Sequence, residues 1–262
     1  MKICIILILA LTTAELWAQK LDDIVTDRPD QTESALTIPK GFIQAELGAS
    51  IEQIETIKTP LGNLYVREHS YPAILLRYGI SNSVELRLAA EFMQTHFDNI
   101  EYDEESVSGF SPITVGTKVH MFNEKGAFPE TALLFHITIP FGGNRNFQPQ
   151  YVCTDFRFSM QHELSDRFAL SYNLGGEWSG DDPKATGIYT LSLGVSLIKK
   201  LSMFVESYGF LTQDETPDHR LDGGFTYLFS KNIQADLSGG IGISDKSPDF
   251  FIGAGLSVRL PR

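Results

Sequence analysis

Four charged side chains near the start of the chain are the first feature that could carry chemistry. Asp27, Arg28, Asp30 and Glu33 lie in the stretch TDRPDQTES, where Pro29 fixes one bend. Carboxylates at this spacing could act as a general acid and base, as a ligand clamp, or only as part of a solvated arm. Because no histidine or nucleophile stands near Asp27 and Asp30, a catalytic pair is the weakest interpretation. The choice between the other two depends on the elements that follow.

From residue 41 onward the chain alternates apolar and polar residues, which is typical of β-strands. In residues 83–93, Val84 and Leu86 point one way, and Glu85 and Arg87 point the other. About twelve such segments are predicted, each of roughly 10 residues, the length that a tilted strand needs to cross a bilayer. They begin near residues 41, 70, 83, 112, 128, 151, 168, 186, 201, 220, 233 and 250. The pattern predicts an all-β fold: a transmembrane, antiparallel, up-and-down β-barrel of about 12 strands.

The expected connections alternate between short and long, as in outer-membrane barrels with tight periplasmic turns and longer outer loops. The short ones are 79–83, 123–126, 164–167, 199–200 and 230–232, and the long ones are 52–69, 97–111, 142–150, 180–185, 211–219 and 244–249. The alternative is a secreted, soluble β-sandwich, whose strands are usually shorter, about 5–6 residues. Here the polar face combines glycine with paired charges such as Asp155 and Arg157, which favours a narrow, wet barrel interior.

The ends and the composition of the chain indicate its cellular compartment. Residues 1–18 have the form of a secretory signal peptide, with Lys2 before a short apolar run. We expect residues 19–40 to form a periplasmic N-terminal arm and residues 41–262 to form the barrel, in the outer membrane of a Gram-negative-type bacterium. The expected partners are outer-membrane lipids, the assembly machinery and a small solute. The net charge of -12 argues against nucleic acid, and the scattered histidines predict no metal site or other cofactor.

The opening of the mature chain resembles a known family. TDRPDQTES, followed by IPKGFIQAELG, is similar to the start of the outer-membrane transporters named for the MetA pathway of phenol degradation. The resemblance is specific over residues 26–48 and extends to the whole mature chain in architecture. It implies a β-barrel of the outer membrane with a role in transport.

Within such a barrel, the charged residues of the polar face would line the lumen. The candidates are Arg77, Glu85, Arg87, Glu91, Lys118, His120, His136, Asp155 and Arg157. The arm could fold inward and pair Asp27, Arg28, Asp30 and Glu33 with these wall charges, since a barrel of about twelve strands has room for a small segment. Charge complementarity and the family resemblance favour this docked arm over a solvated one.

The solute and the function class are less constrained. Some apolar residues on the polar face leave room for a hydrophobic or aromatic solute: Leu75, Met93, Phe122, Phe204 and Phe210. We therefore expect a monomeric barrel that passes or binds a small solute. A barrel without transport, with an acidic loop at 99–105 that gathers cations, is the alternative, although this loop lacks EF-hand spacing. An enzyme is not expected, because the motif of outer-membrane phospholipases and the GxSxG, Walker and dinucleotide motifs do not occur.

Overall fold

The computed structural model describes residues 22–59, 62–99 and 102–260, so the expected signal peptide lies outside the described residues. Strands dominate the described part, which has one short 3-10 turn, η1 (Arg145–Phe147), and no helix long and apolar enough to cross a membrane. The strands are β1 (Ile43–Thr59), β2 (Gly62–Ser81), β3 (Val84–Asn99), β4 (Tyr102–Phe110), β5 (Thr114–Phe122), β6 (Glu130–Thr138), β7 (Cys153–Ser165), β8 (Phe168–Trp178), β9 (Thr186–Ile198), β10 (Leu201–Thr212), β11 (Asp218–Ser230), β12 (Ile233–Gly242) and β13 (Phe250–Leu260).

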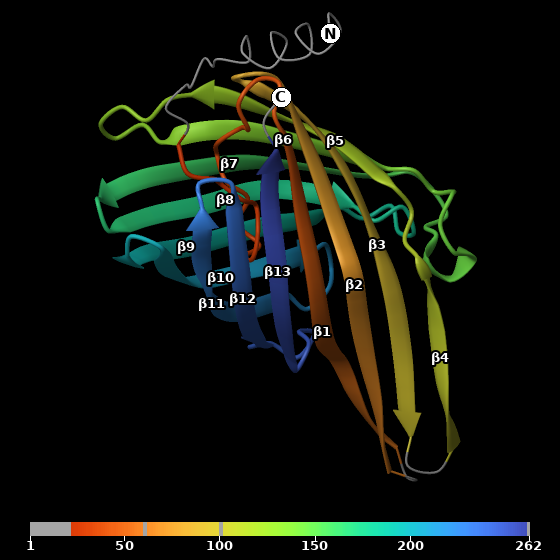
Figure 1. Cartoon of the computed structure of the whole chain (residues 1–262). Helices are drawn as coiled ribbons and strands as arrows, with labels where there is room; N and C mark the ends of the chain where they lie inside the picture. Colours follow the sequence, from red (N-terminus) through yellow and green to blue (C-terminus); the bar gives the residue numbers. More distant parts are fainter. Residues whose placement is uncertain (1–21, 60–61, 100–101, 261–262) are drawn as a thin grey trace, which may run out of the picture.

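The sheet closes on itself as a barrel (Figure 1). Strand β1 pairs with β2 on one side and with β13 on the other, where Ile43 lies opposite Leu260 and Gln53 opposite Phe250. All pairings are antiparallel, and neighbouring strands of the barrel follow one another in the chain except around β4. Without β4, the 13-stranded sheet is a barrel of 12 strands. The predicted up-and-down β-barrel is therefore confirmed, with one extra strand.

The extra strand arises because one edge of β3 is shared by two strands. β5 pairs with residues 84–89 of β3, and β4 pairs with residues 92–99. Between β4 and β5 the chain is pinned to β3 at Glu91, whose carbonyl accepts the amide of Ser111 at 2.8 Å. Pro112 follows directly, and it lacks the N–H that would continue a ladder. The interruption therefore falls where the sequence has a proline.

Two of the predicted loops are wrong. Residues 52–69 and 97–111 were expected to be outer loops, but β1–β2 and β3–β4 continue through them as hairpins that reach beyond the rest of the barrel (Figure 1). The first segment contains β-branched residues, such as Ile54 and Val66, which suit a pleated sheet. Pairing with the adjacent strand also satisfies the backbone groups that a loop would leave open.

The strict alternation of short and long connections is also wrong at one turn. The β5–β6 connection runs from 123 to 129, longer than the 213–217 connection between β10 and β11. A register shift between His120 and Phe122 precedes it. Because a bulge moves later side chains to the other face, Phe122 is 61% exposed instead of facing the lumen as predicted.

The two faces of the barrel wall have reversed polarity relative to a soluble protein. Inside, Gln44, Glu85 and Lys118 are completely buried. Outside, Leu86, Leu237 and Ile252 stay about half exposed, with many other large apolar side chains. Such a continuous apolar exterior would be unfavourable in water and matches the lipid-facing band of a membrane barrel. The soluble sandwich is excluded by this distribution.

Candidate functional site

The described part of the N-terminal arm, residues 22–40, forms a loop inside the barrel (Figure 1). It starts at the β11–β12 turn, where the Ile24 amide donates to the Lys231 carbonyl at 2.8 Å. It leaves at the β2–β3 turn, where the Lys40 amide donates to Asn82 Oδ1 at 3.1 Å. Both turns lie at the same end of the barrel, so the arm enters and leaves through one mouth.

Asp27 holds the arm to one side of the wall. Its Oδ2 lies 3.1 Å from Arg77 Nη1, 2.5 Å from Arg87 Nη1 and 2.7 Å from Lys118 Nζ. These cations come from β2, β3 and β5, and their side chains are almost fully buried. Burial alone would raise the pKa of Asp27, but Arg77, Lys118 and Arg87 together hold it well below its usual range. The carboxylate is therefore ionised and fully paired.

Wall carboxylates balance the same cations. Arg77 Nη1 donates to Glu46 Oε1 at 2.9 Å, and Arg77 Nε donates to Glu85 Oε1 at 2.8 Å. Glu85 Oε1 also accepts from Arg87 Nη1 at 3.1 Å. A buried charge is tolerated when it is paired and hydrogen-bonded. These pairs let the barrel carry a charged site at its centre.

Glu33 is the second arm carboxylate in this cluster, and the least enclosed. Its Oε2 lies 3.0 Å from Arg87 Nη2 and 3.7 Å from Lys118 Nζ, and its side chain keeps 17% exposure. Its backbone is fixed separately, because the Glu33 amide donates to Asn173 Oδ1 at 2.7 Å and its carbonyl accepts from Asn173 Nδ2 at 3.0 Å. The main chain is thus anchored while the carboxylate faces an open part of the lumen.

Arg28 points to the part of the wall formed by β1, β12 and β13, which adjoins β2, and packs over two glycines that we call the glycine floor. Gly48 of β1 and Gly255 of β13 are cross-strand partners, and a Cβ on either would clash with the Arg28 guanidinium. Arg28 Nη2 lies 3.3 Å from Asp236 Oδ1 and donates to the Ala254 carbonyl at 3.2 Å. Glycine at these positions therefore makes room for the arm.

The apex of the arm contacts β9 and β10. The Gln31 amide donates to Glu206 Oε2 at 2.8 Å, and the Thr32 hydroxyl bonds to Glu206 Oε1. The Ser192 hydroxyl donates to Asp30 Oδ2 at 3.0 Å. Burial, followed by the neighbouring Glu206 carboxylate, raises the pKa of Asp30 well above its usual range. Asp30 therefore sits in an acidic environment that differs from that of Asp27.

A large cavity, which we call the chamber, lies over the Glu33 side of the arm. Its volume is about 590 Å³. Six of the predicted lumen and arm residues line it: Glu33, Arg87, Glu91, His136, Asp155 and Arg157. This volume falls in the range of small-molecule sites.

The charged groups of the chamber are only partly paired. His136 Nδ1 lies 2.8 Å from Asp155 Oδ1, so Asp155 is paired with its neighbour on β6 and not with the arm. Glu91 Oε2 accepts from the Ser70 hydroxyl at 2.7 Å. Arg157 Nη1 donates to the Gln31 carbonyl at 3.3 Å and has no carboxylate within ion-pair distance among the described residues.

His120 is a predicted lumen residue that lies away from both the Asp27 contacts and the chamber. Its Nε2 lies 2.7 Å from Glu130 Oε1, and it lines a separate cavity of about 490 Å³ with Leu36 and Thr37 of the arm. Glu33 of the arm lines the chamber, whereas Leu36 and Thr37 line this second cavity. The arm therefore passes from one cavity to the other.

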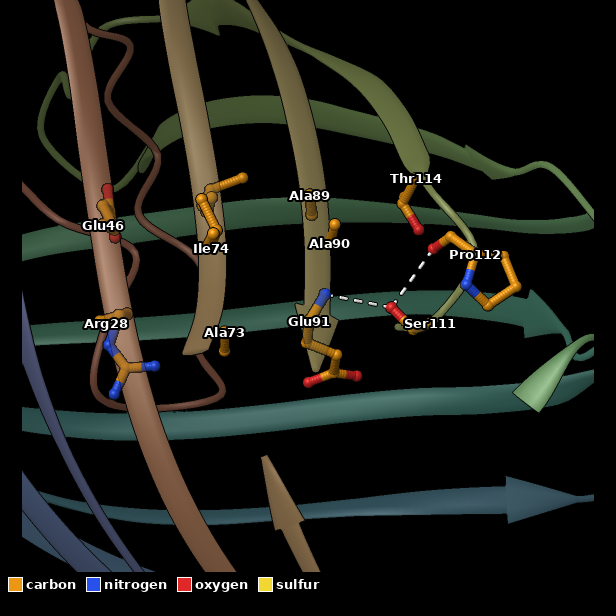
Figure 2. Close-up of a pocket in the computed structure, with 11 residues that line it drawn as sticks. Arg28, Glu46, Ala73, Ile74, Ala89, Ala90, Glu91, Ser111, Pro112 and Thr114 are labelled. Atoms are coloured by element: carbon orange, nitrogen blue, oxygen red, sulfur yellow. Dashed lines mark hydrogen bonds between the residues drawn. The ribbon is translucent and has the colours of Figure 1, made fainter. Parts of the chain in front are cut away.

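A third cavity, of about 240 Å³, lies where β4 gives way to β5. Figure 2 shows Ser111 beside Glu91, with the Glu91 amide donating to Ser111 Oγ at 3.1 Å. Its other walls include the small side chains of Ala73 and Ala89 and the arm residue Arg28. This cavity shares Ala89 and Glu91 with the chamber.

Several contact residues of the arm are missing from the sequence-based candidates. They are Glu46, Asn173, Ser192, Glu206 and Asp236. Each lies on the polar phase of its strand, so the alternation alone could have identified them as lumen residues. Among the described residues, no group of three or more histidine, cysteine, aspartate or glutamate side chains is placed to hold a metal ion.

The closed barrel, its apolar exterior and its charged lumen define an outer-membrane-type β-barrel. Residues 26–260 match the family described as "Putative MetA-pathway of phenol degradation", and the chain belongs to this family. The resemblance seen in the opening residues is thereby confirmed. Comparison with curated proteins found no match.

Solved structures share the fold. An outer membrane channel from Pseudomonas putida F1 is 12% identical, with 90% of this chain and 100% of that chain covered and a TM-score of 0.69. The translocator domain of the autotransporter NalP from Neisseria meningitidis is 10% identical, with 85% and 90% covered and a TM-score of 0.54. Neither protein is described as an enzyme. Because a channel and a translocator domain perform different tasks, the function has to be argued from the site.

Proposed function

We propose that this chain is an outer-membrane channel for a small hydrophobic or aromatic solute, and that its N-terminal arm closes the lumen. The observation that carries the proposal is the arm itself. Asp27 pairs with Arg77, Arg87 and Lys118 from one wall, and Arg28 pairs with Asp236 from another. A segment tied to two sides of a barrel by charges acts as a plug that can be displaced.

The position of the arm divides the lumen into compartments. The chamber lies on one side, and the cavity of about 490 Å³ that contains His120 lies on the other. Leu36 and Thr37 line the second cavity, while Glu33 lines the first. A solute that enters the chamber would have to pass this part of the arm to continue.

The solute class rests on the family and on the cavity walls. The family description refers to phenol degradation, which points to aromatic compounds. Leu75 and Ala89 supply apolar surface in the chamber, and Phe204 is a buried aromatic side chain of the lumen. A closed barrel of this family that retains a chamber of such size supports uptake of a small molecule.

The topology also suggests the orientation. The mouth through which the arm enters carries the short turns, which face the periplasm in outer-membrane barrels. The arm would then follow directly after the cleaved signal peptide. The apolar exterior would face outer-membrane lipids, and insertion would need the assembly machinery of that membrane.

The test compares the mature chain with a variant that lacks residues 20–38. Both are refolded into detergent micelles, checked by the migration shift between boiled and unboiled samples, and measured in planar bilayers. The intact barrel should conduct little, whereas the deletion should give larger conductance steps. Phenol added to the bath should interrupt the current of the deletion variant, while sucrose serves as the non-aromatic control.

Unchanged conductance together with unchanged stability would contradict the plug. A deletion variant that folds but does not conduct would contradict the channel and favour a barrel without transport. A mature chain that stays soluble without detergent would contradict the membrane location.

A further inference from the structure

The charges of the chamber disfavour ions of either sign. Glu91 and Glu177 line it without a cation within ion-pair distance among the described residues, beside the paired Asp155. These carboxylates would repel an anion. Arg157, which has no carboxylate within ion-pair distance among the described residues, lines the same space and would repel a cation. A neutral solute escapes both repulsions, and it can still form hydrogen bonds with the polar wall.

One hydrogen-bond acceptor in the chamber has a fixed orientation. A carboxylate only accepts hydrogen bonds, so the contacts of Asp155 with His136 Nδ1, at 2.8 and 3.0 Å, place the proton on Nδ1. In a neutral imidazole the other nitrogen, Nε2, then carries the lone pair. No described residue forms a hydrogen bond with His136 Nε2, and the His136 side chain keeps 15% exposure. The free acceptor of His136 is therefore available to a solute.

The backbone also holds the imidazole in place. A Cβ on Gly116, the neighbour of His136 across the β5–β6 ladder, would clash with His136 Cδ2. The ring thus lies directly over a glycine while its Nδ1 edge is tied to Asp155. A ring fixed at two edges presents its remaining nitrogen in one direction, which is what selective recognition requires. Leu75 and Ala89 line the same chamber and offer contact for an apolar body.

We propose that His136, positioned by Asp155, is the recognition residue of the chamber, and that the chamber selects neutral aromatic solutes that carry a hydroxyl group. Such a solute donates its hydroxyl hydrogen to His136 Nε2 and places its ring against Leu75 and Ala89. This inference rests on the proposed channel function and narrows its solute class to phenols. Aromatic hydrocarbons and ethers of the same size bind more weakly, because they leave the acceptor unpaired.

The experiment compares phenol with anisole, its methyl ether, which has the ring but no donor. Binding of each to the full mature chain, refolded in deuterated micelles, is measured at about pH 8 by saturation-transfer NMR, with empty micelles subtracted. The phenol hydroxyl remains protonated there, since phenolic groups ionise near pH 10. The wild-type barrel should bind phenol about three- to tenfold more tightly than anisole, the effect of one net hydrogen bond.

Four variants separate recognition from folding. His136→Phe keeps a ring without an acceptor, so phenol and anisole should bind to this variant with the same affinity. His136→Gln restores an acceptor and should recover part of the preference. Asp155→Asn allows the amide to donate to Nδ1, which would move the imidazole proton to Nε2 and should also remove the preference. His120→Phe is the matched control, because His120 is paired with Glu130 in the other cavity.

Each result bears on the proposal. Equal binding of phenol and anisole to the wild-type barrel would overturn it, as would a preference that survives in His136→Phe. A loss in His120→Phe as large as that in His136→Phe would reassign recognition away from the chamber. The bilayer test separates the failure of this inference from the failure of the proposed channel function. If the arm-deleted barrel conducts but shows no preference for phenol, only this inference is overturned. If it does not conduct, the channel function is overturned.

Discussion

Oδ2 of Asp27 lies 2.7 Å from Nζ of Lys118, although 91 residues separate them in the chain. Both side chains are almost fully buried, at 1% and 0% exposure. The contact joins the arm to the wall at a depth where water does not screen the two charges. The docked arm is therefore held in the barrel by a charge that it carries itself.

Replacing Asp27 with asparagine should release the arm. The variant leaves Arg77, Arg87 and Lys118 with one carboxylate fewer, and loss of one partner from a buried ion pair typically costs about 3–5 kcal/mol. The open fraction in planar bilayer recordings should rise strongly. Asp23→Asn is the control, because Asp23 belongs to the same arm but is exposed. An open fraction that is the same in both variants would show that the arm is not held by this charge.

Replacing Gly48 with alanine should loosen the arm without unfolding the barrel. All three atoms nearest to a Cβ at this position belong to the flexible Arg28 side chain, so the guanidinium would move and its contact with Asp236 would weaken. We expect more frequent openings and an unchanged urea midpoint of the barrel. An Arg28→Ala variant should give the same phenotype, and adding Gly48→Ala to it should have no further effect. Additive effects of the two changes would contradict the role of the glycine floor.

Closure should weaken as the pH rises. Burial and Glu206 raise the pKa of Asp30, so the docked arm holds a proton that the free arm releases above about pH 4. Docking of the arm therefore becomes less favourable as the pH rises from about 4 to the pKa of the docked Asp30. Docking lowers the pKa of Asp27, so the contribution of Asp27 has the opposite dependence on pH and changes only below about pH 4.

The measurement is the open fraction between about pH 5 and about pH 8, which should increase in the wild-type channel. Asp30→Asn keeps an oxygen that can accept the Ser192 hydroxyl and removes the ionisation. This variant should stay closed more often at neutral pH and respond less to pH. A pH response that is identical in the two proteins would assign it to other groups.

A charged residue on the outer face should destabilise the barrel by an amount that depends on its depth in the bilayer. Leu88 lies on the outer face of β3, within the stretch that pairs with β5, and is 42% exposed. Leu88→Arg should destabilise the barrel by about 2–4 kcal/mol, the cost of arginine at the bilayer midplane. Leu164→Arg, beside the β7–β8 turn, should cost only about 0–1 kcal/mol. Urea unfolding in lipid vesicles measures both, and equal costs would contradict the assumed depth of the two residues.

The sequence alone determined the class of this protein. Side chains alternate across a strand with a period of two, so Glu85 and Arg87 had to share one face and Leu86 and Leu88 the other. The alternation is a local property of each strand. Because it recurs in about twelve segments, it indicates a barrel before any contact between strands is known. The charges of the arm, from Asp27 to Glu33, likewise suggested a docked segment before any contact was known.

Only the tertiary structure decided which groups meet. Strand alternation assigns a face to Asp155, but the register of β6 against β7 gives it His136 as its partner. The floor under Arg28 requires Gly48 and Gly255 to lie opposite each other, and this depends on how β1 and β13 close the barrel. The hairpins beyond the barrel depend on pairing in the same way. Cross-strand register and barrel closure are long-range properties, and a single strand pattern cannot contain them.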